Sequence, residues 1–349
     1  MKTRITELFG IRYPILLSGM SWISVPRMVA AVSNAGGLGV LATGPMNTET
    51  TRAAVREIRS LTDKPFGANA TLFFPGAKEN AKVLLEEQVP VINFALGKGD
   101  WIVKGAHEYG GKVIATVAYH EHARRAEGFG TDALIVTGHE AAAHGEAVTS
   151  LVLVPSIADA VKIPVIAAGG FADGRGLAAA LALGAHGIAM GTRFMTTKES
   201  PLHERYKKLA LEKNVYDTLY SDRFDGLPSR VMKTKPALKQ MKRGLDVIGS
   251  FSNSADIAKN LHLPYFRMLR ETLGQGWKKA IALAYTANSF KQVHAATVDG
   301  DLKKGVLPAG QATGLINDIP TVEEVIGRIV RQAEETSQII NTMALQQER

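Results

Sequence analysis

Cysteine is absent from the 349-residue sequence. Its absence excludes disulfides, thiolate metal sites, iron–sulfur clusters and cysteine nucleophiles. Long apolar runs are also missing, since no stretch approaches the roughly 18 uninterrupted apolar residues of a membrane span. The first seven residues are mostly polar or charged and contain no apolar run of signal-peptide length. We therefore expect a cytoplasmic protein that has no membrane contact.

Positive charge is distributed unevenly along the chain. The formal net charge is +8, and residues 193–243 hold 13 Lys/Arg against 6 Asp/Glu. A solvated, lysine-rich helical face is the simplest interpretation, and a patch that attracts an anionic substrate, cofactor or protein is the second. The segment lacks the interleaved aromatic residues of a single-strand nucleic-acid platform, so no nucleic-acid partner is expected.

Eight short apolar runs alternate with segments that have the periodicity of helices. The runs rarely alternate polar with apolar residues, which indicates strands covered on both faces, as in a parallel sheet. Eight strand–helix units favour an α/β fold of the (β/α)8 TIM barrel type over a doubly wound open sheet, because no GxGxxG motif follows the first run. The predicted strands cover residues 13–17, 38–42, 66–72, 89–95, 113–117, 133–137, 163–168 and 187–190. The predicted helices between them include residues 26–34, 48–61, 77–87, 102–109, 121–128 and 175–183.

This alternation stops between residues 200 and 290, where the pattern predicts helices and loops. We expect this segment to form a smaller, mostly helical domain over the barrel mouth, inserted before the C-terminal segment. The barrel itself is then built from residues 1–199 and 291–349. Residues 321–342 have the pattern of a long amphipathic helix, and Thr321 with Glu324 forms a capping box at its start.

Glycine-bearing loops follow the seventh and eighth predicted strands, where barrel enzymes commonly bind phosphate. Gly169 and Gly170 lie shortly before a predicted helix start, whose free N–H groups and partial positive charge suit a phosphate dianion. Gly191 and Thr192 offer two N–H groups and a hydroxyl. Together the two loops predict a phosphate site, and tight strand–helix packing is the alternative explanation for the glycines.

Histidines after the sixth strand are candidates for proton transfer. His144 lies on a barrel-top loop among small residues, and imidazole titrates near neutral pH, so His144 is the first candidate and His139 the second. His120 and His122 are two positions apart and have no set of carboxylates to complete a coordination shell. No metal site is therefore expected.

Two further loops carry residues suited to an aromatic cofactor. The side-chain amide of Asn69, at the end of the third strand, can both donate to and accept from the edge of a ring. Gly19 and Met20 follow the first strand, where the methionine can lay a flexible apolar side chain against that ring.

Taken together, the motifs resemble the nitronate monooxygenase (2-nitropropane dioxygenase-like) family. That family also contains flavin-dependent NADH:quinone reductases and FMN-type enoyl-acyl-carrier-protein reductases. The resemblance covers nearly the whole chain and implies an oxidoreductase with non-covalently bound FMN. Besides the two phosphate motifs, it is carried by residues 4–10 (RITELFG), 33–39 (SNAGGLG), 61–69 (LTDKPFGAN) and 309–316 (AGQATGLI).

The resemblance also implies roles for individual residues. His144 falls on the family's catalytic histidine, which deprotonates a nitroalkane so that the resulting nitronate reacts with the flavin and O2 to give a carbonyl compound and nitrite. The residues implied to lie beside the flavin ring are Met20, Asn69 and the backbone of Ala142. The residues implied to bind the FMN phosphate are Gly169, Gly170, Gly191 and Thr192.

Four positions depart from the pattern common in the family. Leu17 lies where many members have glutamine, Thr116 replaces a lysine, Thr137 replaces an acidic residue, and Ala143 replaces the glycine before the histidine. Because such changes alter the surroundings of the flavin, a second function stays open, namely NAD(P)H-dependent reduction of quinones or enoyl thioesters. A third is a scaffold that binds a phosphate ligand without turnover. The physiological substrate and the oligomeric state, with a homodimer among the options, stay open as well.

Overall fold

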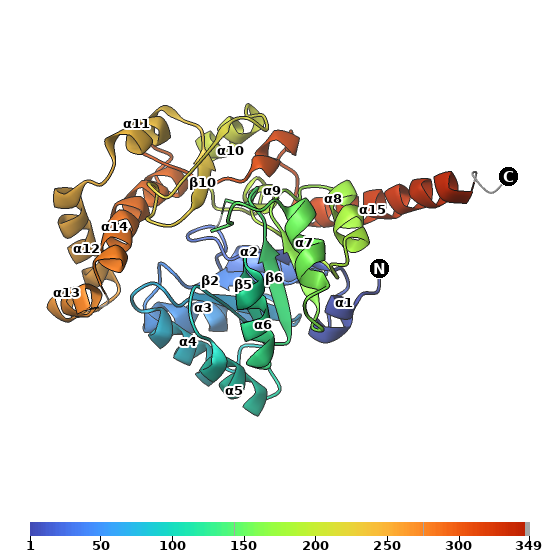
Figure 1. Ribbon diagram of the computed structural model, residues 1–349, viewed down its shortest axis with the longest axis horizontal. Coiled ribbons are helices and arrows are strands. Elements are labelled where there is room, and N and C mark those ends of the chain that lie inside the picture. Colours follow the sequence, from blue (N-terminus) through green and yellow to red (C-terminus); the bar gives the residue numbers. More distant parts are fainter. Residues whose placement is uncertain (143, 275, 346–349) are drawn as a thin grey trace.

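Eight parallel strands form a nearly closed barrel, with helices between them (Figure 1). The structure is a computed structural model that describes residues 1–142, 144–274 and 276–345, so Ala143 and residues 346–349 of the predicted barrel segment lie outside it. The strands are β1 (Ile15–Leu17), β2 (Gly39–Ala42), β3 (Phe66–Thr71), β4 (Val91–Ala95), β5 (Lys112–Val117), β6 (Ala133–Thr137), β7 (Val165–Ala168) and β8 (Ile188–Met190).

Strand pairing follows the chain from β2 to β8, and β8 pairs in turn with β1. A single parallel bridge between Leu16 and Leu38 joins β1 to the residue before β2 and brings the sheet round on itself. The strands are short apolar runs, and β2, β6 and β7 are buried along their whole length, because helices cover one face and the barrel interior the other. The predicted TIM barrel is confirmed.

Helices alternate with these strands around the barrel. The helices α2 to α6 and α8 begin and end within two residues of the predicted bounds, whereas α1, α7 and α9 were not among the predicted helices. The helices of the barrel are α1 (Arg4–Phe9), α2 (Pro26–Asn34), α3 (Thr48–Leu61), α4 (Ala77–Glu86), α5 (Asp100–Glu108), α6 (His120–Gly128), α7 (Ser150–Ala158), α8 (Gly174–Ala182) and the short α9 (Thr192–Met195).

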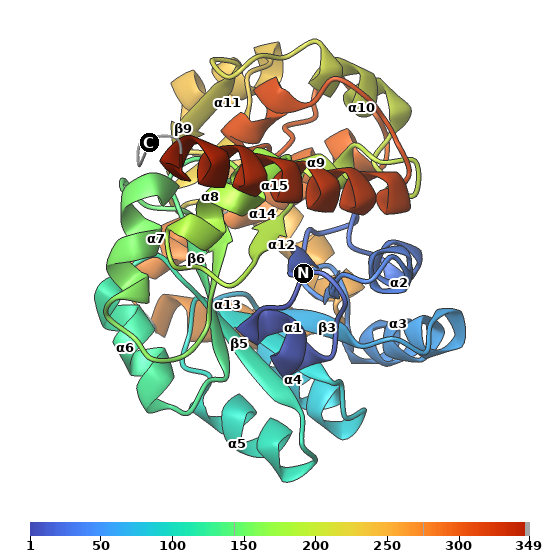
Figure 2. The same cartoon turned by 90° about the vertical axis from the view of Figure 1, so that its right-hand side faces the viewer.

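The C-terminal helix α15 (Val322–Leu345) lies across the flank of the barrel, against α8 and α2 (Figure 2). Its predicted capping box is confirmed. The Thr321 amide donates to the Glu324 carboxylate at 2.7 Å, and the Thr321 hydroxyl accepts from the Glu324 amide at 3.1 Å. None of the helices in the described part of the chain is long and apolar enough to cross a bilayer.

Residues 200–297, called the lid below, follow the barrel strands and contribute to the cavity at the barrel mouth. The lid is mostly helical, as predicted, but it also contains an antiparallel hairpin that the sequence analysis missed. Its last helix continues seven residues past the predicted domain boundary at residue 290. The elements are α10 (Glu204–Leu211), β9 (Thr218–Ser221), β10 (Ser229–Met232), α11 (Lys235–Arg243), α12 (Val247–Asn260), α13 (Tyr265–Gly274) and α14 (Trp277–Thr297).

Candidate active site

A cavity of about 930 Å³ lies between the carboxyl ends of the barrel strands and the lid. Loops after β1, β3, β6, β7 and β8 line it from the barrel, and the β9–β10 hairpin and α12 to α14 line it from the lid. Of the predicted site residues, all but the second histidine candidate, His139, are found in this lining. These residues are Gly19, Met20, Asn69, Ala142, His144, Gly169, Gly170, Gly191 and Thr192.

The turn after β7 requires glycine at two successive positions. Gly169 has a φ of +101° and Gly170 a φ of +84°, a region that side chains disfavour. At Gly169 a Cβ atom would also lie 3.0 Å from the carbonyl oxygen of Gly138 and 3.0 Å from the Ser150 hydroxyl. The turn therefore brings bare backbone to the cavity wall, which suits close approach by an anionic ligand.

The start of α8, expected to present free N–H groups, is already occupied by the protein itself. The Asp173 carboxylate accepts from the amides of Arg175 and Gly176 at 3.0 and 3.2 Å, and the side chain of Gln332 on α15 accepts from the Gly174 amide at 2.8 Å. The expectation that this helix start presents free N–H groups is thus wrong, because an N-cap and a neighbouring helix satisfy its donors.

Other donors remain at the same corner of the barrel. Among the hydrogen bonds found within the described ranges, none uses the backbone amides of Gly170, Gly191 or Thr192 as donor. The Thr192 hydroxyl accepts from the Gly310 amide at 3.0 Å and keeps its own proton for a further bond. The loops after β7 and β8 therefore offer a cluster of N–H and O–H donors of the kind that binds phosphate.

One carboxylate also lies at this corner. A Cβ atom on Gly170 would be 3.5 Å from the side chain of Glu140. The Glu140 carboxylate is held at the start of α7, where the amide and hydroxyl of Ser150 donate to it at 2.9 and 3.0 Å. Its charge is thereby partly balanced by the positive end of α7.

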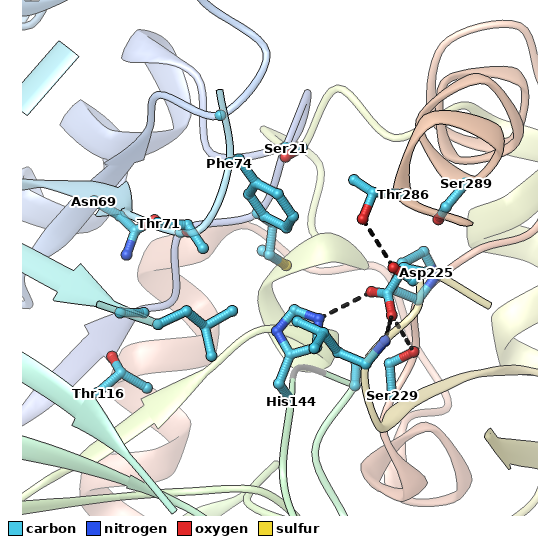
Figure 3. A pocket seen from close by; sticks show the side chains of 18 of the residues that line it. Ser21, Asn69, Thr71, Phe74, Thr116, His144, Asp225, Ser229, Thr286 and Ser289 are labelled. Atoms are coloured by element: carbon cyan, nitrogen blue, oxygen red, sulfur yellow. Dashed lines mark hydrogen bonds and ion pairs between the residues drawn. The ribbon is translucent and has the colours of Figure 1, made fainter. Parts of the chain in front are cut away.

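A chain of side-chain hydrogen bonds fixes Asn69. Figure 3 shows Asn69, Thr71 and Thr116 across the cavity from Asp225. The Asn69 amide nitrogen donates to Asn93 at 2.6 Å, and the Thr71 hydroxyl donates to the Asn69 oxygen at 3.0 Å. Asn93 in turn donates to the Thr116 hydroxyl at 3.0 Å. Thr116, one of the departures from the family pattern, therefore belongs to an uncharged network that includes a predicted cofactor residue.

The loop after β1 packs directly on that network. A Cβ atom on Gly19 would lie 2.9 Å from Cβ of Asn69, so only glycine allows this approach. Met20 lies beside the loop after β8, since a Cβ atom on Gly191 would be 3.2 Å from its sulfur. Gly19 and Met20 thus connect the Asn69 side of the cavity with the loops after β7 and β8. The residues Gly169, Gly170, Gly191 and Thr192 of those loops are called the glycine corner below.

His144 forms a pair with a residue from the lid. Its Nε2 atom lies 2.9 Å from Oδ2 of Asp225, and both side chains are 22% exposed (Figure 3). The other oxygen of Asp225 accepts from the Leu227 amide and the Ser229 hydroxyl, each at 3.1 Å. An oriented carboxylate at Nε2 favours the tautomer that carries its proton there and leaves Nδ1 as the basic nitrogen.

The hairpin that carries Asp225 also forms hydrogen bonds with the loop that carries His144. The Tyr220 hydroxyl donates to the Gly145 carbonyl at 2.9 Å, and the Arg230 amide donates to the Ala142 carbonyl at 3.2 Å. The Arg230 guanidinium donates to the carbonyl of His139 at 2.9 Å, and burial lowers its pKa from the usual arginine value. His139 itself is not among the residues that line the cavity, and its ring contacts that of Tyr220 in a tilted arrangement, with an interplanar angle of 58°.

Two of these residues carried signals that the sequence analysis did not use. Asn93 is a polar residue inside the apolar run of β4 and is the register partner of Asn69 on β3. Asp225, by contrast, lies 81 positions from His144 in a polar turn, and nothing local marks it as a partner. Within the described residues, no group of three or more His, Asp or Glu side chains is arranged to hold a metal ion.

Comparison with known proteins matches residues 2–82 and 73–332 to the family model described as nitronate monooxygenase. The chain is 37% identical, over 95% of its length and 96% of the relative's, to (3aS,4S,5R,7aS)-5-hydroxy-7a-methyl-1-oxo-octahydro-1H-indene-4-carboxyl-CoA dehydrogenase of Mycobacterium tuberculosis. It is 32% identical to a probable nitronate monooxygenase of Staphylococcus aureus, over 66% of this chain and 78% of that protein. FabK from Thermotoga maritima is similar in structure, with a TM-score of 0.82 and 38% identity over 98% of this chain and 99% of that one.

Proposed function

The chain belongs to the nitronate monooxygenase family and is an oxidoreductase, and from this premise we propose that it uses FMN to oxidise or reduce a bulky acyl thioester of coenzyme A. The observation that carries the proposal is the large cavity with the His144–Asp225 pair in its wall. The CoA dehydrogenase relative, which matches over almost its whole length, supports the substrate class.

The glycine corner fits the phosphate of FMN. Its backbone is free of side chains at Gly169 and Gly170, and the amides of Gly170, Gly191 and Thr192 donate to no acceptor among the residues that the structure describes. A phosphate held there leaves room for an aromatic ring between the first and third loops, where Met20 and Asn69 lie. When bound, FMN supplies the exchange of electrons with an organic substrate, which no side chain can perform.

Residues around the ring would hold and tune it. Asn69 keeps one amide hydrogen and one lone pair for a ligand, because Asn93 and Thr71 use the others. Gly19 and the backbone of Ala142 complete the predicted set on either side. Since Thr116 brings no charge to this network, the ring would be contacted by neutral donors and acceptors on this side.

The size and lining of the cavity favour a bulky acyl group. Pockets for drug-sized ligands span about 300–1,000 Å³, and this cavity of about 930 Å³ is at the upper end. Its lid side is lined by apolar and aromatic side chains, so an extended hydrocarbon would lose contact with water there. The lid side chains in question include Phe251, Ile257, Leu261, Leu269, Trp277, Ile281 and Phe290.

His144 would move the proton in the reaction. With Nε2 turned to Asp225, its Nδ1 atom can accept a proton from an acidic C–H or O–H of the substrate, or return one in the reverse direction. Asp225 would stabilise the imidazolium that forms and keep the ring in one orientation.

We also propose that residues 1–199 and 291–349 bind the cofactor, while residues 200–290 cover the substrate.

An anaerobic titration of the FMN-loaded protein tests this function. Flavin absorbance near its long-wavelength maximum is followed while NADH, NADPH, a cyclic hydroxyacyl-CoA or a nitronate is added. We expect the hydroxyacyl-CoA to reduce the oxidised flavin while its alcohol becomes a ketone, or an added enoyl-CoA or oxoacyl-CoA to reoxidise flavin that was first reduced with a nicotinamide. If bulky acyl-CoA compounds neither reduce the oxidised flavin nor reoxidise the reduced flavin, the proposed thioester substrate is rejected. If the protein does not bind FMN, the proposed cofactor is rejected.

Nitronate oxidation with O2 is the second candidate. The resemblance described above implies that His144 corresponds to the family's catalytic histidine, and the Staphylococcus relative is named as a probable nitronate monooxygenase. The same titration distinguishes the two functions, because a nitronate that bleaches the flavin anaerobically and yields nitrite in air favours this candidate. The departures at Leu17, Thr116 and Thr137 are the reason that it comes second.

A further inference from the structure

One face of α14 makes a row of contacts that link the lid hairpin to the barrel. Ala282, Thr286, Phe290 and His294 are each four residues apart, so their side chains lie on one face of the helix. This row is called the α14 stripe below. Each of its members contacts either the turn that carries Asp225 or the loop after β1.

At the N-terminal end of the stripe, Ala282 and Thr286 contact the turn of the β9–β10 hairpin. Gly226, with a φ of +87°, approaches α14 so closely that a Cβ atom would lie 2.5 Å from Cα of Ala282. One helical turn further along, the Thr286 hydroxyl donates to the backbone carbonyl of Asp225 at 2.8 Å (Figure 3). The backbone of Asp225 is therefore fixed from α14, independently of the bonds to its carboxylate.

At the C-terminal end of the stripe, Phe290 and His294 pack against Trp22. The indole ring lies 4.5 Å from the ring of Phe290 and 5.5 Å from that of His294, both in edge-to-face geometry. Trp22 belongs to the loop that also carries Met20, and it lines the same cavity. Edge-to-face aromatic pairs add specific attraction to the apolar area that they bury.

The backbone of Trp22 is strained, which points to a function for its orientation. Its φ is +61°, in the left-handed region that a bulky side chain rarely adopts. The turn is held by the amides of Ile23 and Ser24, which both donate to the Met20 carbonyl. Strain of this kind persists where surrounding structure enforces it, and it is concentrated at functional sites.

We propose that the α14 stripe holds Asp225 in position against His144, an arrangement called the strut below. Trp22 is the positioning residue at the C-terminal end of the stripe. Because the Trp22 loop also contributes to the predicted cofactor side of the cavity, the strut ties the geometry of the proton-transfer pair to that side. The proposal uses the proposed function only in treating His144 as the proton-transfer residue.

A double-mutant cycle with Trp22→Ala and Asp225→Asn in the FMN-loaded enzyme tests the strut. We expect Trp22→Ala alone to lower kcat about fivefold to tenfold, a size common for coupled neighbours, with a smaller effect on KM. In the Asp225→Asn background the same change should lower kcat by less than about twofold, because the contact it serves is already lost. Equal losses of kcat in both backgrounds would overturn the proposal.

Two further variants keep the test independent of how well Trp22→Ala folds. Thr286→Val removes the bond to the Asp225 carbonyl and keeps the side-chain shape, so it should show the same dependence on Asp225. Lys291→Ala serves as the matched control, because Lys291 is exposed on the same helix and is not part of the stripe. We expect kcat of this control to equal that of the parent.

A second readout does not depend on turnover. In protein labelled with ¹⁵N-histidine, the Nε2–H signal of His144, identified by its loss in His144→Ala, reports the bond to Asp225. The signal should persist in the parent and in Lys291→Ala and broaden or vanish in Trp22→Ala and Thr286→Val. An unchanged signal in both Trp22→Ala and Thr286→Val would refute the strut. If the signal changes as expected but no thioester activity is found, only the proposed function is refuted.

Discussion

The glycine corner and the His144–Asp225 pair lie in one cavity but are built in different ways. The corner consists of backbone from two neighbouring strand ends of the barrel, Gly169–Gly170 and Gly191–Thr192. The pair joins a barrel loop to a lid turn 81 positions further along the chain. A site made of adjacent strand ends is set once the barrel forms, whereas a site made across two units also depends on how they dock.

This difference predicts that cofactor binding and proton transfer can be impaired separately. Changes at the corner should weaken cofactor binding and leave the proton-transfer pair intact. Changes in the lid should impair catalysis in protein that still binds its cofactor. The following predictions test this separation.

The largest effect is expected from His144→Ala. Removing a positioned acid–base group typically lowers the rate by about 10²–10⁴-fold, and we expect a loss of that size in kcat. FMN binding, followed by the quenching of flavin fluorescence during titration of the apoprotein, should stay within about twofold of the parent because the histidine is not part of the corner. A parallel loss of FMN affinity would show that the two sites are not separable.

Asp225→Asn should have the next largest effect. The amide cannot stabilise an imidazolium as a carboxylate does, and a misplaced reacting group can lower a rate by up to about 10²-fold. We expect kcat to fall by about tenfold or more with unchanged FMN affinity. Asp222→Asn, an exposed change in the same turn, is the control, and a comparable loss there would assign the effect to the turn as a whole.

Gly170→Ala should act on the corner instead. A left-handed backbone costs a residue with a side chain roughly 1–2 kcal/mol, which corresponds to about 5- to 30-fold weaker FMN binding if the empty loop relaxes and the bound loop cannot. Gly110→Ala is a matched control, since Gly110 has a φ of +80° and open space around it but lies far from the cavity lining. Isothermal titration with FMN distinguishes them, and equal affinities for both variants would contradict the assignment of the corner.

The smallest expected effect concerns the ion pair that ties α9 to the C-terminal segment. The buried guanidinium of Arg193 donates to Asp318 at 2.9 Å, and Arg328 contacts the other carboxylate oxygen. Burial alone would raise the pKa of Asp318, but hydrogen bonds from Arg328 and Arg193 outweigh it and lower that pKa below the ordinary aspartate value. A carboxyl whose pKa is lower in the folded state stabilises the fold above its unfolded pKa, and it loses this contribution as pH falls through the folded value.

Asp318→Asn should therefore lower the free energy of unfolding at pH 7 by about 1 kcal/mol, a modest value because the carboxylate is 37% exposed to solvent. The difference from the parent should shrink as pH falls below about 4, near the unfolded pKa of aspartate. Urea unfolding at several pH values measures it. A difference that stays constant down to the lowest pH at which the protein folds would exclude the ion pair as its cause.

The barrel could be predicted from sequence because each of its units repeats the same local signals. Strands such as β6 at Ala133–Thr137 are apolar up to their last residue, and helices such as α2 at Pro26–Asn34 have a clear periodicity. Both match the predicted bounds. The β9–β10 hairpin was missed because its strands are four residues long, carry polar residues and are stabilised by contacts to the His144 loop.

The candidate site followed the same rule. Positions at strand ends, such as Asn69 and Gly191, could be predicted because a barrel brings all its strand ends to one face. The partner of His144 could not, because Asp225 is brought in by the docking of the lid. The donors at the start of α8 were assigned wrongly, because Asp173 was not recognised as their cap and because a side chain from α15 completes it.

The seam between β1 and β2 has a consequence for exchange of the cofactor. Only one bridge, Leu16 to Leu38, and the two backbone bonds beside it join these strands, while the other neighbours pair along longer stretches. Brief local opening needs to break few bonds there, so amide protons of Leu17 and Leu38 should exchange with solvent earlier than those of β4 or β5. Since Gly19 and Met20 follow β1 after a single residue, the same local opening would give the flavin ring of the proposed cofactor a route to leave and be replaced without unfolding of the barrel.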